Sequence, residues 1–336
     1  MKSYILKRIL LGVVVLFGVI LITFFLTRVI PSNPAAQWAG SRATPAQIQK
    51  ARIELGLDKP IYVQFEKYVV DLFHGNLGTS LRTKQPVLKE LETYLPPTIE
   101  LVFWSTIMAV LIGIPLGLNS ARKKDHALDH FCRFFSVGAV SLPTFWVALF
   151  LQLIFYRKLG ILPLGGQLDT KMNILYNVPH NTGLLLLDSL LSGQIPVFLN
   201  AAKHIILPAV TIALYPMGLV ARMTRSSLLE ILEEDYIKAA RSYGIKERFI
   251  IWRYALKNSM GTTVTVLALS IGYTLTNTFL VEAIFSWPGI GNYISTAVVS
   301  LDYPAIMGVT LFSACAYILL NLIADIIISF DPRVRV

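Results

Sequence analysis

Six long apolar runs dominate the sequence, and they exclude a soluble fold. The first run, residues 9–30, follows Lys2, Lys7 and Arg8 and is long enough to cross a bilayer, which takes about 20 residues as a helix. It is too long for the apolar core of a signal peptide, so we predict an uncleaved first span. The chain is 54% hydrophobic and 15% charged, which is typical of an integral membrane protein.

The remaining runs predict an all-α membrane protein with six transmembrane helices. Pro208 and Pro216 predict a break in the fourth span. Lys and Arg residues beside the spans give the topology, with both termini in the cytoplasm, and they account for the net charge of +10 without nucleic-acid binding. The five further spans are expected at residues 98–121, 134–156, 204–222, 260–281 and 304–330.

Three segments are expected outside the membrane. Residues 31–97 carry apolar positions at helical spacing and predict a small helical cap after the first span. Within residues 157–203, the stretch at 182–191 is too short to span and predicts an interfacial or cap helix. Residues 282–303 contain Trp287 and no Lys or Arg, as expected of an external re-entrant loop.

Two short patterns near the second span have structural and chemical interpretations. Gly113 and Gly117 have the spacing that lets a second helix approach closely, so we interpret them as a packing site. His126 and His130 lie one helical turn apart and could bind a metal, but a solvated loop beside the membrane is the favoured interpretation.

Residues 223–258 form the longest polar segment between spans on the cytoplasmic side. We predict two short helices hinged at Gly244, the first with an apolar stripe that needs a partner surface. The predicted stripe consists of Leu228, Leu229, Leu232, Tyr236, Ala239 and Ala240.

Hydroxyl groups are concentrated in the fifth predicted span. They indicate either helix packing, with each hydroxyl bonded to its own helix, or the lining of a polar path. No phosphate-binding loop, nucleophile elbow or zinc-helix motif occurs in the sequence, so we expect no enzyme and an external energy source. Together with the third span, the expected path residues are Ser141, Thr144, Thr265, Ser270, Thr274 and Asn277.

Several long stretches, in order, resemble the B-type permeases of the dipeptide/oligopeptide family of ABC importers. The matching stretches are ILKRIL, IPSNPA, LGLDKPIYVQFEKYVVDLFHGNLGTS, YLPPTIEL, SLPTFW, HIILPAV, RMTRSSLLEILEEDYIKAARSYG, FSWPGIG and DPRVR. The resemblance covers nearly the whole chain and implies the type I ABC importer permease fold in a bacterial or archaeal cytoplasmic membrane. It further implies that Asp235, Tyr236, Ala239, Ala240 and Gly244 form the coupling helix that docks on an ATP-binding subunit.

Two residues depart from the family pattern. Lys238 stands where the general motif has Glu, so Asp235 is expected to supply the acidic contact. Gly261 stands where related chains often have Pro, which leaves the rigidity of that junction open.

The resemblance also implies the partners and the substrate class. We expect a second homologous permease, two ATP-binding subunits that hold ATP and Mg, and an extracytoplasmic binding protein, with no cofactor in this chain. Peptide is the favoured substrate, and nickel chelates, glutathione and oligosaccharides are alternatives within the same machinery. A secondary transporter that acts without ATP is the alternative from another class.

Overall fold

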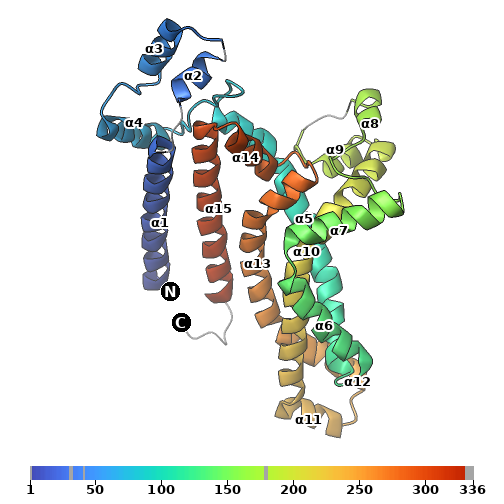
Figure 1. The fold of residues 1–336 in the computed structure, drawn as a ribbon. Coiled ribbons are helices and arrows are strands. Elements are labelled where there is room, and N and C mark those ends of the chain that lie inside the picture. The colour runs from blue at the N-terminus through green and yellow to red at the C-terminus, as the bar shows by residue number, and fades with distance from the viewer. Residues whose placement is uncertain (1, 30–32, 41, 178–180, 330–336) are drawn as a thin grey trace. The chain divides into compact units, whose positions relative to one another are not determined.

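The computed structural model describes residues 2–29, 33–40, 42–177 and 181–329, and these form helices without a β-strand (Figure 1). This confirms the predicted all-α class. The described residues divide into two compact units, which are described in turn: 99–287 with 319–329, and 2–98 with 288–318.

The larger unit is built around one long helix. This helix, α10 (Ile195–Leu232), packs against α6 (Ala127–Ser141), α7 (Thr144–Leu151), α9 (Leu185–Leu191) and α13 (Leu256–Ile284). The remaining elements of this unit are most of α5 (Val87–Arg122), η1 (Gln152–Lys158), α8 (Thr170–Leu175), α11 (Asp235–Ser242), α12 (Glu247–Phe249), η2 (Ile250–Ala255) and the end of α15 (Tyr303–Ser329).

Helix α5 approaches α10 closely at two glycines. A Cβ atom at Gly113 would lie 2.9 Å from Cγ1 of Val220, and one at Gly117 would lie 2.8 Å from Cβ of Thr224 and collide with the carbonyl oxygen of Ala221. Only glycine permits this spacing, which confirms the packing interpretation of the pair.

The third predicted span is two helices instead of one. Helices α6 and α7 meet at an angle of 107°, with Leu142 and Pro143 between them. Proline restricts the preceding residue to extended conformations, and Leu142 has φ −76° and ψ 133°, so α6 ends there. The third span predicted at residues 134–156 thus contains a sharp bend that the sequence analysis did not predict.

The fourth predicted span is longer than expected and is not broken by its prolines. Helix α10 runs through Pro208 and Pro216, both buried, and continues beyond Arg222 as far as Leu232. The predicted break at the prolines was wrong, and the polar segment that starts at Met223 begins inside this helix. Neighbouring helices that bury a proline can compensate for the backbone hydrogen bonds that it removes.

The segment between α7 and α10 folds onto this unit through buried polar groups. Glu100 accepts a 2.7 Å hydrogen bond from the backbone N–H of Leu186, at the start of α9. Asp188 accepts hydrogen bonds from the backbone of Thr182 and Gly183 in the turn that precedes the helix. The predicted short helix exists, but its Leu185–Leu186 side is buried in the core, while Leu191 is exposed.

The smaller unit contains the predicted cap, which is helical as expected. Its helices are α1 (Lys2–Val29), α2 (Pro34–Ala39), α3 (Pro45–Glu54), α4 (Ile61–Phe73), α14 (Ile290–Val299) and the start of α15 (Tyr303–Ser329). Asp302 is buried at the start of α15 and accepts hydrogen bonds from the hydroxyl of Ser80 (2.5 Å) and the backbone N–H of Leu81 (3.0 Å). This carboxylate fastens the cap segment to α15.

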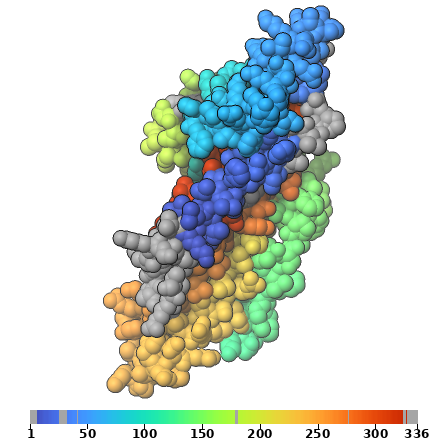
Figure 2. Space-filling view, turned by 90° about the vertical axis from the view of Figure 1, so that its left-hand side faces the viewer, coloured from blue at the N-terminus to red at the C-terminus, as the bar shows by residue number. Residues whose placement is uncertain are grey.

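Helices of spanning length agree with the predicted number of spans. Four helices among the described residues are long and apolar enough to cross a membrane, or up to six if each of two bent pairs is one span. Much of α1 is exposed on the face seen in Figure 2, where it runs below the light-blue cap. Its exposed Val14 and Ile22 suit contact with lipid or another chain.

Substituting the glycine at the tightest helix contact should destabilise the larger unit. Gly117→Ala is expected to lower the melting temperature of the purified protein, because the added methyl group meets backbone atoms of α10 that cannot move aside. Gly138→Ala in α6 is the matched control, since a Cβ atom there meets nothing within 4 Å, and should preserve or raise the melting temperature. Equal melting temperatures for the two variants would refute the close contact.

Candidate coupling site

The candidate site begins where α10 ends and the chain turns sharply into α11. Glu233 and Glu234 separate the two helices, and Glu234 has the extended conformation of an N-cap residue. Asp235 lies in the first turn of α11 and Arg241 in its last turn, which places each charge where it stabilises the helix dipole.

The inner face of α11 is fixed to the protein's own core. Ile237 is fully buried and Ala240 is 9% exposed, and both belong to a cluster from four elements. The other members are Leu118 and Ala121 of α5, Leu228 and Ile231 of α10, and Ile250, Ile251 and Ala255 of η2. Burying an Ile or Leu side chain contributes on the order of 2 kcal/mol, so these contacts attach α11 firmly to α5, α10 and η2.

Gly244 makes the predicted turn after α11. Its φ of 75° lies in the left-handed region, which a residue with a Cβ adopts at a cost. The backbone N–H of Gly244 donates to the carbonyl of Arg241 (2.9 Å), and that of Ile245 donates to Ala240 (3.2 Å), as at many helix C-termini. This confirms the hinge at Gly244, although the preceding helix starts at Asp235.

Two side-chain contacts hold the returning chain against α11. The guanidinium of Arg241 donates to both carboxylate oxygens of Glu247, at 2.9 and 3.2 Å. The amide of Asn258 donates to the Tyr236 hydroxyl at 3.0 Å. The segment from α11 to α13 is thus cross-linked at both ends of α11.

The outer face of α11 is exposed, and the residue at its centre, Ala239, has a small side chain. Ala239 is exposed, and the side chains of Tyr236 and Tyr243 beside it are 42% and 85% exposed. Lys238, which departs from the family pattern, forms a 3.0 Å ion pair with Asp235 on this face. The structure therefore separates the predicted set: Asp235, Tyr236, Ala239 and Gly244 are exposed, whereas Ala240 faces the protein's own core.

A buried ion pair joins α6 to α10, about two turns of α10 before that helix ends at the site. Asp129 is fully buried. Its carboxylate accepts hydrogen bonds from Nε (2.5 Å) and Nη2 (2.9 Å) of Arg225 and from the Ser120 hydroxyl (2.6 Å). The backbone N–H of Asp125 donates a further bond of 3.0 Å. The fully hydrogen-bonded carboxylate fixes the α5–α6 turn to the helix that carries α11.

The metal interpretation of the α5–α6 turn finds no ligand set among the described residues. They contain no group of three His, Cys, Asp or Glu side chains placed to hold an ion. Nδ1 of His126 lies 2.9 Å from the Lys124 carbonyl, and Nδ1 of His130 lies 3.0 Å from the guanidinium of Arg133.

The predicted path residues fall into two environments. Ser270 and Thr274 are buried in α13, and each hydroxyl donates at 2.7 Å to a carbonyl of its own helix, as the packing interpretation expects. Asn277 is exposed and also bonds its own helix, while Thr265 is half-buried. Ser141 and Thr144 flank the bend between α6 and α7. Their role in a path stays a prediction.

Sequence reasoning missed the residues that hold the site from behind. The predicted stripe assumed one continuous helix and therefore left out Ile231 and Ile237. The break between α10 and α11 at Glu233 changes which residues of α11 face the core. The run Glu233–Glu234–Asp235 was the available signal, since acidic residues favour a helix start. The Asp129–Arg225 pair joins distant segments, and no local pattern indicates it.

The fold and this site define a membrane permease subunit that carries a short, rigidly supported helix with an exposed outer face. Residues 113–336 match the family described as binding-protein-dependent transport system inner membrane component, and residues 1–102 match the N-terminal family of the same systems. The chain belongs to this family of inner-membrane permeases, which are transport subunits and not enzymes. It therefore works with a binding protein and other subunits of an ABC transport system.

Relatives match over the full length. The chain is 46% identical to a probable D,D-dipeptide transport system permease of Escherichia coli, over 96% of this chain and 94% of the relative. It is 40% identical to a dipeptide permease of Alkalihalophilus pseudofirmus over all of both chains. It is 39% identical to a di/tripeptide permease of Pseudomonas aeruginosa over 100% of this chain and 99% of the relative.

Breaking the buried ion pair should destabilise the protein strongly. Arg225→Gln leaves the Asp129 carboxylate buried without its main partner, which typically costs about 3 kcal/mol or more, so a large fall in melting temperature is expected. Arg133→Gln is the matched control, because Arg133 is 46% exposed and its contact with Asp129 is longer, at 3.4 Å. A melting temperature for Arg225→Gln as high as that of the control would contradict the assignment.

Proposed function

We propose that this permease forms, with a second homologous permease, the path by which an ATP-driven importer takes up di- and oligopeptides. Two ATP-binding subunits would hold ATP and Mg and dock on α11, and an extracytoplasmic binding protein would deliver the peptide. The peptide substrate rests on the full-length relatives, which are named as dipeptide and di/tripeptide transport permeases.

The observation that carries the coupling role is the two-sided construction of α11. Its inner residues Ile237 and Ala240 are buried in the cluster with α5, α10 and η2, while its outer surface around Ala239 is open and small. A partner bound to the outer surface would move α10 and α5 together, because the inner surface of α11 is packed against both helices. ATP binding would then open the path toward the binding protein by alternating access.

The path itself is proposed to run between the two permeases. The hydroxyls of Ser141 and Thr144 at the bend, and the polar groups of Thr265, Ser270, Thr274 and Asn277 in α13, would offer weak hydrogen bonds to a passing peptide backbone. Several weak sites favour passage over retention, as in multi-site conduction.

Enlarging the outer face of α11 should separate coupling from folding. Ala239→Trp is expected to abolish peptide uptake and recovery of the ATP-binding subunits, while membrane insertion and melting temperature stay normal, because Ala239 is exposed. Ala239→Ser is the size-matched control and should transport normally. Ala240→Trp should instead lower the melting temperature, since that side chain is buried. Normal peptide uptake by Ala239→Trp would refute docking of the ATP-binding subunits on this face of α11.

The substrate is tested with the purified complex. The tagged chain is expressed with its genomic neighbours, and ATP hydrolysis is measured with the binding protein in the presence of dipeptides. Recovery of two ATP-binding subunits and a second permease, with hydrolysis stimulated by dipeptide, is the expected result. Stimulation only by a nickel chelate, glutathione or an oligosaccharide would overturn the peptide assignment, and ATP-independent uptake by the chain alone would overturn the importer.

A further inference from the structure

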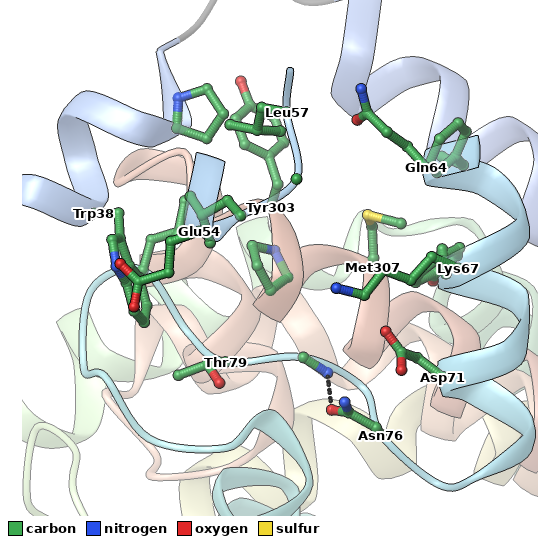
Figure 3. Close-up of a pocket in the computed structure, with 18 of the residues that line it drawn as sticks. Trp38, Glu54, Leu57, Gln64, Lys67, Asp71, Asn76, Thr79, Tyr303 and Met307 are labelled. Atoms are coloured by element: carbon green, nitrogen blue, oxygen red, sulfur yellow. Dashed lines mark hydrogen bonds between the residues drawn. The ribbon is translucent and has the colours of Figure 1, made fainter. Parts of the chain in front are cut away.

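A cavity of about 430 Å³ lies within the smaller unit, between the helices of the cap and the start of α15. Figure 3 shows α4 on one side, with Gln64, Lys67 and Asp71, and Trp38, Glu54 and Leu57 on the other. Tyr303 and Met307, both from α15, lie between these walls. The cavity has no part in the coupling site, which belongs to the larger unit.

The α4 wall presents charges of both signs. Lys67 and Asp71 are one helical turn apart, and both point from α4 into the cavity (Figure 3). This spacing usually allows a salt bridge. Within the part of the chain that the structure describes, however, neither side chain has an ion pair or a hydrogen bond. The two charged side chains face the same space without pairing with each other.

Buried polar atoms without partners line the same cavity. Tyr303 is 6% exposed, and its hydroxyl is buried with no hydrogen-bond partner among the described residues. The amide oxygen of Gln64 is buried in the same way, although its nitrogen donates to the Lys59 carbonyl at 2.7 Å. Unsatisfied buried groups are costly and call for a partner. Burial raises the pKa of Tyr68, a further lining residue, to about 12, so it adds no charge near neutral pH.

The remaining lining is mixed, and the cavity lies on the polar side of α4. Its other polar members are Glu54, Lys59, Asn76 and Thr79. Phe24, Leu77, Pro304 and Met307 contribute apolar surface. On the opposite side of α4, Tyr62 and Phe73 are 73% and 87% exposed. The face of α4 that suits lipid thus points away from the cavity, which favours a water-soluble ligand.

We propose that this cavity binds a free short peptide as a zwitterion. The peptide ammonium pairs with Asp71, its carboxylate pairs with Lys67, and a backbone carbonyl accepts a hydrogen bond from the Tyr303 hydroxyl. A backbone N–H donates to the Gln64 amide oxygen, and an apolar side chain packs on Met307. Charges of both signs beside apolar surface suit an amphiphilic zwitterion, and the choice of a peptide among such molecules rests on the proposed function.

Calorimetry on the whole purified complex tests this site. The complex, in nanodiscs and without its binding protein, is titrated with L-leucyl-L-leucine. Lys67→Gln and Asp71→Asn are each expected to weaken binding about tenfold, the usual effect of losing one charged hydrogen bond, and Tyr303→Phe by a smaller factor. Glu66→Gln, on α4 but outside the cavity lining, is the matched control and should bind as the unchanged protein does. N-acetyl-leucyl-leucine amide, which lacks both charges, should not bind.

Three results would overturn the proposal. They are an affinity for leucyl-leucine unchanged in both charge variants, equal affinity for the uncharged analogue, or a phospholipid retained by the complex and lost from the charge variants in native mass spectrometry. ATP-driven uptake with the binding protein is measured on the same samples. Uptake of leucyl-leucine without binding at the cap refutes only this inference, and binding at the cap without any peptide uptake refutes only the proposed function.

Discussion

The close contact between α5 and α10 is the constraint on which the larger unit depends. Because Gly113 and Gly117 lack side chains, the backbone of α5 lies against Val220, Ala221 and Thr224 of α10. That approach brings the end of α5 beside the end of α10, where Leu118 and Ala121 complete the apolar cluster behind α11. It also places Ser120 within 2.6 Å of Asp129, which in turn holds Arg225. One steric condition thus supports both the buried ion pair and the candidate coupling helix.

The proposed coupling role requires rigid support, because α11 has only eight residues. An isolated helix of that length is unstable in water, since nucleation costs more than a few hydrogen bonds return. In this protein α11 is stabilised by tertiary contacts: Ile237 and Ala240 are buried beneath it, and Arg241 is tied to Glu247. These contacts leave Ala239 exposed on the outer face, so the proposed docking surface and the supporting core use different residues of one helix.

Local sequence patterns predicted the helices better than the breaks and bends between them. The apolar runs gave the spanning helices, and Gly244 gave the turn after α11. These patterns failed where tertiary packing decided the outcome. Pro208 and Pro216 carry the usual signal of a broken helix, yet both are buried inside the continuous helix α10. Pro143 does end α6, and the chain turns by 107° there, because the preceding Leu142 is extended. Proline alone does not distinguish these cases.

Composition and periodicity by themselves determined the membrane class, the helical cap and the position of the polar segment that carries the candidate site. Each follows from the cost of placing polar groups in lipid and from the helical repeat, which are properties of neighbouring residues. Only the tertiary structure decided that Ala240 faces inward while Ala239 faces outward, and that Asp129 pairs with Arg225. It likewise brought Lys67, Asp71 and Tyr303 around one cavity. These outcomes join residues far apart in the chain, and the packing of whole helices sets them, which no local sequence pattern encodes.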